Sequence, residues 1–191
     1  MSAAHIAPGK GGKSLWVFGD LVTCKITGHR TGGAYSLFEV VTWPGSSPPR
    51  HVQHREDEAF YVLEGEYEFL VEGRTINAVI GSLIYVPKGN LHTHKNVGEE
   101  PGRMLVSQTP GGLHERFFEE IGEEAKDTPT LAGSENLPDL EGIARIAAEY
   151  GIEMPTESLA QPAGSGRRMN ENEFPPTSGD GSYGTGKKRR H

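Results

Sequence analysis

The segment HVQHREDEAFYVLEGEYEFLVEG, residues 51–73, decides the fold of this chain. Within it, Tyr67, Phe69 and Val71 alternate with residues that are mostly glutamates. An alternation with a period of two and one mostly polar face is typical of a half-buried antiparallel strand. Gly65 separates this run from the apolar run before it, as a turn glycine does between two strands. The segment therefore predicts two short strands in succession.

Similar runs continue on both sides, from Ser14 to about Pro110. Each is short, carries β-branched or aromatic residues, and is bounded by Gly, Pro or Asn. In chain order they are SLWVF, DLVTCKITG, AYSLFEVVTW, EAFYVLEG, EYEFLVEG, TINAVIG, LIYVP, LHTHKNV and RMLVSQT. Short strands in close succession with no predicted helix between them indicate an all-β sandwich or barrel. No internal repeat is visible, so we expect a single barrel.

Predicted helices appear only after the strands. In LHERFFEEIGEEAKD, residues 113–127, apolar Leu113, Phe117 and Ile121 are spaced for one helix face. In LPDLEGIARIAAEYG, residues 137–151, Asp139 is suited to the N-cap and Gly151 to the end of the helix.

These patterns divide the chain into four parts. We expect a flexible N-terminus over residues 1–13, a barrel over 14–110, a helical extension over 111–162 and a disordered basic tail over 163–191. The tail has six basic and three acidic residues and is rich in Gly, Ser, Pro and Asn. Such a composition buries too little apolar surface to offset the entropy lost on ordering.

Composition excludes several classes of protein. The 191 residues carry a formal net charge of −7, so general nucleic-acid binding is not expected. The N-terminal residues lack the apolar region of a signal peptide, and no run is long enough to span a membrane. Cys24 is the only cysteine, which excludes an internal disulfide and a cysteine-based zinc site. A cytoplasmic protein without nucleic-acid or membrane partners is the expectation.

Histidines gather in the strand region. His51, His54, His92 and His94 are four of the eight histidines in the chain, and Glu58 lies close to the first two in sequence. Two imidazoles and a carboxylate brought together from different strands can hold a divalent first-row metal and leave coordination positions open for oxygen and substrate. His51, Glu58 and His92 are the candidates for this set. Ordinary surface histidines on strands are the alternative.

Two spaced motifs surround these residues. The pattern G-x5-H-x-H-x4-E-x6-G fits residues 45–65, except that Gln53 stands at the second histidine position. The pattern G-x5-P-x-G-x2-H-x3-N fits residues 81–96 completely. With nine of ten signature positions matched, the chain resembles the cupin superfamily. The resemblance implies a small double-stranded β-helix, or jelly-roll, barrel.

Three segments, HREDEAFYVLEGEYEF, FGD at residues 18–20 and GGLHERFFEE after the barrel, resemble single-domain bacterial quercetin 2,3-dioxygenase-like cupins. This resemblance implies one divalent metal, Fe, Mn, Co, Ni or Cu, held by His51, Glu58 and His92. It also implies insertion of O2 into a flavonol or a similar enolic or aromatic molecule that chelates the metal. Glu58 would then be a ligand that also accepts the hydroxyl proton of the substrate.

Gln53 leaves three alternatives open, because an amide oxygen is a weaker donor than imidazole. In the first, Gln53 serves as a weak or outer ligand, and His51, Glu58 and His92 suffice to hold the metal. In the second, another histidine supplies the fourth ligand. In the third, the site holds no metal. His94 is better placed than His54 for the second alternative, since it shares a strand face with His92. A buried, hydrogen-bonded position in the pocket is the simpler expectation for His94.

Strand alternation also predicts a pocket. If Glu58 faces the barrel interior, so do Phe60 and Val62, and Phe38 and Val40 on the preceding strand are candidates for the opposite wall. An apolar, aromatic-lined pocket suits a flat aromatic substrate. The alternative is that these side chains form an ordinary core.

The sequence thus favours a metal-dependent dioxygenase acting on a small molecule and O2. The alternative is a non-oxygenase cupin, namely an isomerase, a cyclase or a small-molecule binder with an altered or lost metal site. A homodimer is expected, partly from the resemblance to cupins and partly because small barrels often cover sheet edges by pairing.

Overall fold

The computed structural model describes residues 12–125, 139–155 and 167–168. Most of the expected flexible N-terminus and nearly all of the basic tail lie outside the described residues. Within that tail, Arg167–Arg168 form the short strand β13, which pairs in parallel with β7.

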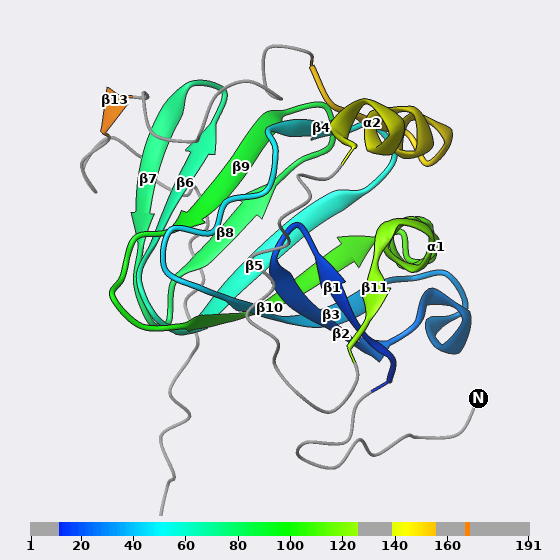
Figure 1. The fold of residues 1–191 in the computed structure, drawn as a ribbon, viewed down its shortest axis with the longest axis horizontal. Helices are drawn as coiled ribbons and strands as arrows, with labels where there is room; N and C mark the ends of the chain where they lie inside the picture. Colours follow the sequence, from blue (N-terminus) through cyan, green and yellow to red (C-terminus); the bar gives the residue numbers. More distant parts are fainter. Residues whose placement is uncertain (1–11, 126–138, 156–166, 169–191) are drawn as a thin grey trace, which may run out of the picture.

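Two β-sheets form the body of the structure (Figure 1). The first has the order β11-β1-β2-β3-β10-β5-β8, and the second has the order β12-β4-β9-β6-β7-β13. The strands of the first sheet are β1 (Ser14–Val17), β2 (Asp20–Ile26), β3 (Ser36–Thr42), β5 (Asp57–Glu64), β8 (Leu83–Val86), β10 (Gly102–Thr109) and β11 (Glu123–Glu124). The others are β4 (His51–Gln53), β6 (Tyr67–Val71), β7 (Arg74–Ala78), β9 (Leu91–Asn96), β12 (Ile152–Glu153) and β13.

The expected all-β class is therefore confirmed: the two sheets form a small jelly roll. Each predicted strand run contains an observed strand. A 3-10 turn at Gly28–Thr31 interrupts the stretch in which only strands were expected, and the two-residue strands β11 and β12 were not predicted. They are too short to show a periodicity in the sequence.

The core lies between the two sheets. The alternation in β6 is observed, with Tyr67 and Phe69 buried, and Phe60 and Val62 of β5 face the same interior. Packing at one edge of the core depends on glycine. Gly65 has φ +89°, and a Cβ there would lie 2.8 Å from the Cα of Gly102. The motif glycine thus permits a turn and a close approach that other residues would strain.

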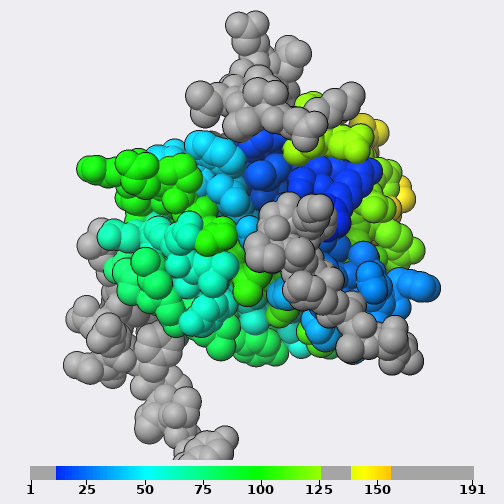
Figure 2. All heavy atoms as spheres, turned by 90° about the horizontal axis from the view of Figure 1, so that it is seen from below, coloured from blue at the N-terminus to red at the C-terminus, as the bar shows by residue number. Residues whose placement is uncertain are grey.

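Two α-helices pack at one end of the sheets, α1 (Leu113–Ile121) and α2 (Leu140–Glu149) (Figure 1). Asp139 is the N-cap of α2, as the sequence predicts, and its side chain accepts a hydrogen bond from the Gly142 amide. Helix α1 ends at Ile121, earlier than the predicted run. The chain then forms β11, which pairs with β1. In Figure 2 the yellow-green atoms of the segment that contains β11 lie beside the blue atoms of the segment that contains β1.

Phe117 of α1 and Ala147 of α2 form a small second core with Ile152. Phe118 contacts this cluster and the main core, so the helices are fixed against the barrel. Neither helix, nor any other in the described ranges, has the length and apolar character needed to cross a membrane.

Candidate metal centre

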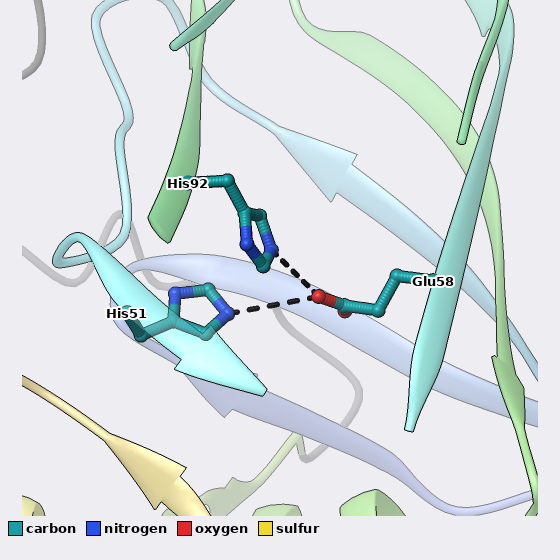
Figure 3. Close-up of side chains that lie close together, drawn as sticks. All are labelled: His51, Glu58 and His92. Atoms are coloured by element: carbon teal, nitrogen blue, oxygen red, sulfur yellow. Dashed lines mark ion pairs between the residues drawn. The ribbon is translucent and has the colours of Figure 1, made fainter. Parts of the chain in front are cut away.

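Strand register places three donor side chains together between the sheets. β4 pairs with β9 so that His51 lies opposite His92, while Glu58 projects from β5 in the other sheet. Their donor atoms lie within 4.8 Å of one another (Figure 3). Within residues 12–125 and 139–155, this is the one group of three or more His, Cys, Asp or Glu side chains so arranged.

Each imidazole is oriented by a backbone carbonyl. Nδ1 of His51 donates to the carbonyl oxygen of Pro49, and Nδ1 of His92 donates to that of Asn90, both at 3.0 Å. With the proton on Nδ1, the Nε2 lone pair of each ring is free and directed toward Glu58 (Figure 3). Metal-ligating histidines are typically held in this way by a hydrogen bond at the other ring nitrogen.

Glu58 is oriented by the neighbouring strand. Gln108 lies opposite Glu58 in the pairing of β10 with β5, and its amide donates to Glu58 Oε1 at 2.7 Å. The other oxygen, Oε2, lies 2.6 Å from Nε2 of His92 and 3.8 Å from Nε2 of His51. Glu58 Oε2 and His92 Nε2 are both buried without a hydrogen-bond partner of suitable angle among the described residues.

Charge at the site is consistent with a bound cation. Burial alone would raise the pKa of Glu58, but His92 beside it outweighs this and lowers the pKa to about 2, so the group is a carboxylate at neutral pH. Burial, with the neighbouring His92, lowers the pKa of His51 to about 3 and keeps that ring neutral. For His92 the effect of burial is outweighed by Glu58, which raises the pKa. The buried carboxylate thus attracts a positive charge, as a proton on His92 or as a metal ion.

The residues present therefore fit a divalent first-row metal. Two imidazole nitrogens and one carboxylate oxygen converge from two sheets, each fixed at its other polar atom, and the convergent atoms lack other partners.

A partly open cavity of about 70 Å³ lies against this centre. Among the predicted pocket residues, Phe38, Val40, Phe60 and His94 line it together with His51 and Glu58. Val62 does not, and its expected role in the pocket is wrong. Its side chain faces the interior as the alternation predicts, but it lies one step further along β5, where the core is filled.

Gln53 is buried and forms a contact that the sequence does not reveal. Its amide nitrogen lies 2.9 Å from Nδ1 of His114, which enters the cavity wall from α1. The same ring nitrogen lies 3.3 Å from Glu56, and all three side chains are buried. The role of Gln53 as a weak or outer ligand stays a prediction.

The other two strand histidines lie outside the three-residue group. His54 is directed away from it, toward solvent, where Nε2 pairs with Glu153 at 2.8 Å. His94 lies on the same face of β9 as His92 and lines the cavity, but its Nε2 is 4.0 Å from Asp20 Oδ2 and has no hydrogen-bond partner in the part of the chain that the structure describes. His94 is thus buried at the cavity as expected, and its hydrogen bond stays a prediction.

Sequence reasoning missed Gln108, Asp20 and His114. The last two lie in the FGD and GGLHERFFEE segments, where the resemblance was noted without a role for either residue. Gln108 carries no signal in the sequence, because its importance depends on which residue lies across the strand pair.

Gln108 gives a first test of the centre. Replacing Gln108 with leucine removes the hydrogen bond to Glu58 Oε1 and frees the carboxylate to rotate, so we expect metal affinity to fall by about 10–100-fold. The affinity is measured by competition with a chelator. Thr109→Val on the same strand, at an exposed position, is the control and should leave the affinity unchanged. An unchanged affinity in Gln108→Leu would mean that Glu58 is not a ligand.

The fold and this centre define a jelly-roll protein with a candidate metal site at the base of an apolar cavity. Residues 38–107 match the family model described as a cupin domain. The match and the fold together support the cupin superfamily.

Curated relatives match parts of this chain. The chain is 29% identical over 84 residues to the uncharacterized protein MJ1618 of Methanocaldococcus jannaschii. The matched region covers 44% of this chain and 67% of that protein. The chain is 37% identical over 84 residues to germin-like protein subfamily 2 member 2 of Arabidopsis thaliana. This matched region covers 40% of this chain and 38% of the relative. The chain thus spans well under half the length of the germin-like relative.

Among solved structures, KdgF from Halomonas sp. has a TM-score of 0.52 at 15% identity, over 58% of this chain and 96% of that one. This similarity concerns the fold alone.

Proposed function

We propose that this chain is a metal-dependent cupin dioxygenase of the quercetinase-like type, which inserts O2 into a flavonol or a similar enolic or aromatic molecule. The observation that carries the proposal is the convergence of His51, Glu58 and His92, each held at its other polar atom, beside an apolar cavity with aromatic walls.

The bound metal would supply Lewis acidity toward the hydroxyl and carbonyl oxygens of such a substrate and bring O2 to it. His51 and His92 would hold the metal through Nε2, and Glu58 through Oε2. The cavity would orient the flat substrate, since Phe60 and Phe38 present aromatic surface to it.

Glu58 would also accept the proton that a substrate hydroxyl releases on binding. Its carboxylate is ionised at neutral pH, so it is able to accept a proton, but its low pKa makes it a weak base. Its negative charge therefore serves first to hold the cation. Gln108 donates to Oε1 in both roles and keeps Oε2 directed at the centre.

Oxygen uptake tests this proposal. The full chain is loaded separately with Fe, Mn, Co, Ni and Cu, and O2 consumption is recorded with a flavonol and with the matching flavone, which lacks the 3-hydroxyl. We expect uptake with the flavonol only, and with at least one metal. If no loaded form consumes O2 with a flavonol, the flavonol dioxygenase assignment is overturned.

A non-oxygenase cupin, acting as an isomerase or a cyclase, is the second candidate. The observation that favours it is His114, which lines the cavity and contacts the buried Glu56 behind it, because an imidazole beside a carboxylate can transfer protons without a metal. This candidate predicts conversion of substrate without consumption of O2, which the same oxygen measurement distinguishes.

A homodimer stays part of the proposal. Tyr61, Leu83 and Tyr85 are exposed apolar side chains on β5 and β8, at one edge of the first sheet. A partner that covers this edge would bury them.

A further inference from the structure

Two buried polar side chains that do not belong to the metal centre face each other at the cavity. Asp20 begins β2 in the first sheet, and His94 lies on β9 in the second. Both line the cavity, with relative exposures of 4% and 8%. Neither takes part in the group formed by His51, Glu58 and His92.

These two side chains do not satisfy each other. His94 Nε2 and Asp20 Oδ2 are 4.0 Å apart, which is beyond hydrogen-bond distance. Asp20 Oδ1 accepts a hydrogen bond from the Ser46 hydroxyl at 2.5 Å, but Nε2 of His94 is buried without any partner in residues 12–125 and 139–155. Leaving a buried polar atom unpaired is costly, so this geometry indicates that a ligand atom completes it.

Among the described residues, the surroundings of His94 offer no such atom. The rings of Phe60, Tyr67 and Phe69 pack around the imidazole, with centroid distances of 5.8, 6.2 and 5.6 Å. The hydroxyl of Tyr67 is paired with Thr42 at 2.8 Å. The remaining free side of the imidazole faces the cavity.

The distance between His94 Nε2 and Asp20 Oδ2 indicates which chemical group of a ligand fits between them. One oxygen atom can lie about 2.8 Å from both Nε2 and Oδ2 when these are 4.0 Å apart. A hydroxyl group can accept from an Nε2–H and at the same time donate to a carboxyl oxygen. A carbonyl group can only accept, and a methyl group can do neither.

We propose that Asp20 and His94 form a subsite that binds a hydroxyl group of an aromatic ligand. This inference deepens the proposed function, on which it rests for the substrate class: the substrate would be a phenolic compound with one hydroxyl at the metal centre and a second at this subsite. Phe60 contacts His92 and His94 with centroid distances of 6.2 and 5.8 Å, so a single aromatic wall connects the two positions.

The charge of Asp20 also suits a neutral group. Burial raises the pKa of Asp20 to about 7, so the carboxyl carries only part of its negative charge at neutral pH. An ammonium group on the ligand would therefore not find a full opposite charge here.

The test compares two probes of the same size, phenol and toluene, which differ in one hydroxyl. Each probe is titrated into the full chain by calorimetry, and the measured quantity is the ratio of the toluene Kd to the phenol Kd. A chelator is present so that no metal can bind phenol. The variants are His94→Phe, which keeps a ring but no nitrogen, and Asp20→Leu, which removes both oxygens. Tyr67→Phe is the matched control, because it removes a buried hydroxyl beside His94 that is already paired.

We expect the ratio to fall about tenfold in His94→Phe and in Asp20→Leu, as the loss of a buried hydrogen bond to the ligand predicts, and to stay unchanged in Tyr67→Phe. The same ratio in the wild type and both variants overturns the subsite, as does failure of phenol to bind the wild type at millimolar concentration.

A second measurement does not depend on the stability of the variants. In nitrogen NMR spectra of the wild type with labelled histidine, phenol should shift the His94 Nε2 resonance and toluene should not. Equal shifts with both probes would overturn the subsite. Because the chelator is present throughout, these outcomes are separate from metal loading and oxygen uptake, on which the dioxygenase proposal depends.

Discussion

Replacing His92 with alanine is expected to abolish stable metal binding, from close to one first-row ion per chain in the wild type to a background level. His92 is the most buried of the three donors, with 1% of its side chain exposed, and its Nε2 is the nitrogen nearest to the carboxylate oxygen. Its removal leaves one imidazole and one carboxylate, too few protein donors to retain a metal against a chelator. The measurement is elemental mass spectrometry after dialysis against excess metal.

His54→Ala is the matched control for this variant. His54 is also a strand histidine with a carboxylate partner, but its side chain is half exposed and its partner is Glu153 on β12, outside the centre. It should retain the wild-type metal content. Retention of metal in His92→Ala as well would show that the ion binds elsewhere, and an absence of metal from every form would remove the basis of the dioxygenase proposal.

The control also shows what the sequence was able to predict. Alternation along the strands separates His54 from His51, and motif spacing selects Glu58 and His92 from the remaining candidates. These are local properties: side-chain direction repeats every two residues, and turn glycines such as Gly65 mark where each strand ends. The fold class follows from such signals, and the members of the candidate metal centre follow from them together with the cupin motifs.

The rest depends on contacts between distant parts of the chain. Gln108 orients Glu58 only because β10 pairs with β5 in one particular register, which a single sequence does not specify. His114 meets Gln53 only because α1 packs back against the barrel. In the same way, alternation predicts that Val62 faces inward, but not where the cavity ends and the filled core begins.

The burial of Asp20 beside the cavity is expected to make the stability of the protein depend on pH. Burial raises the pKa of Asp20 from 3.8 to about 7, although the hydrogen bond from Ser46 opposes this shift. The folded state therefore holds the proton more tightly than the unfolded state does. For a carboxyl group with a raised pKa, the stabilising contribution is complete below the unfolded pKa and is lost as the pH rises through the folded pKa. The wild type should lose stability from this group between about pH 4 and pH 7.

Asp20→Asn cannot ionise and should not show this loss. We expect the free energy of unfolding of the variant, relative to the wild type, to increase between pH 4 and pH 8 by on the order of 4 kcal/mol, since each unit of pKa shift corresponds to about 1.4 kcal/mol. Denaturant unfolding of both proteins across this range, without metal, measures the difference. Other groups that titrate here, including His94 with its lowered pKa, are present in both proteins and largely cancel in the comparison.

Ser46→Ala provides the control for the physical cause. The Ser46 hydroxyl donates to Asp20 Oδ1 and favours the ionised carboxylate, so its loss should raise the pKa of Asp20 further and extend the loss of stability to higher pH. A difference between Asp20→Asn and the wild type that does not change with pH would show that Asp20 stays ionised in the fold. His94 would then have a full negative charge in front of it, and the second subsite would select a cation in place of a neutral hydroxyl.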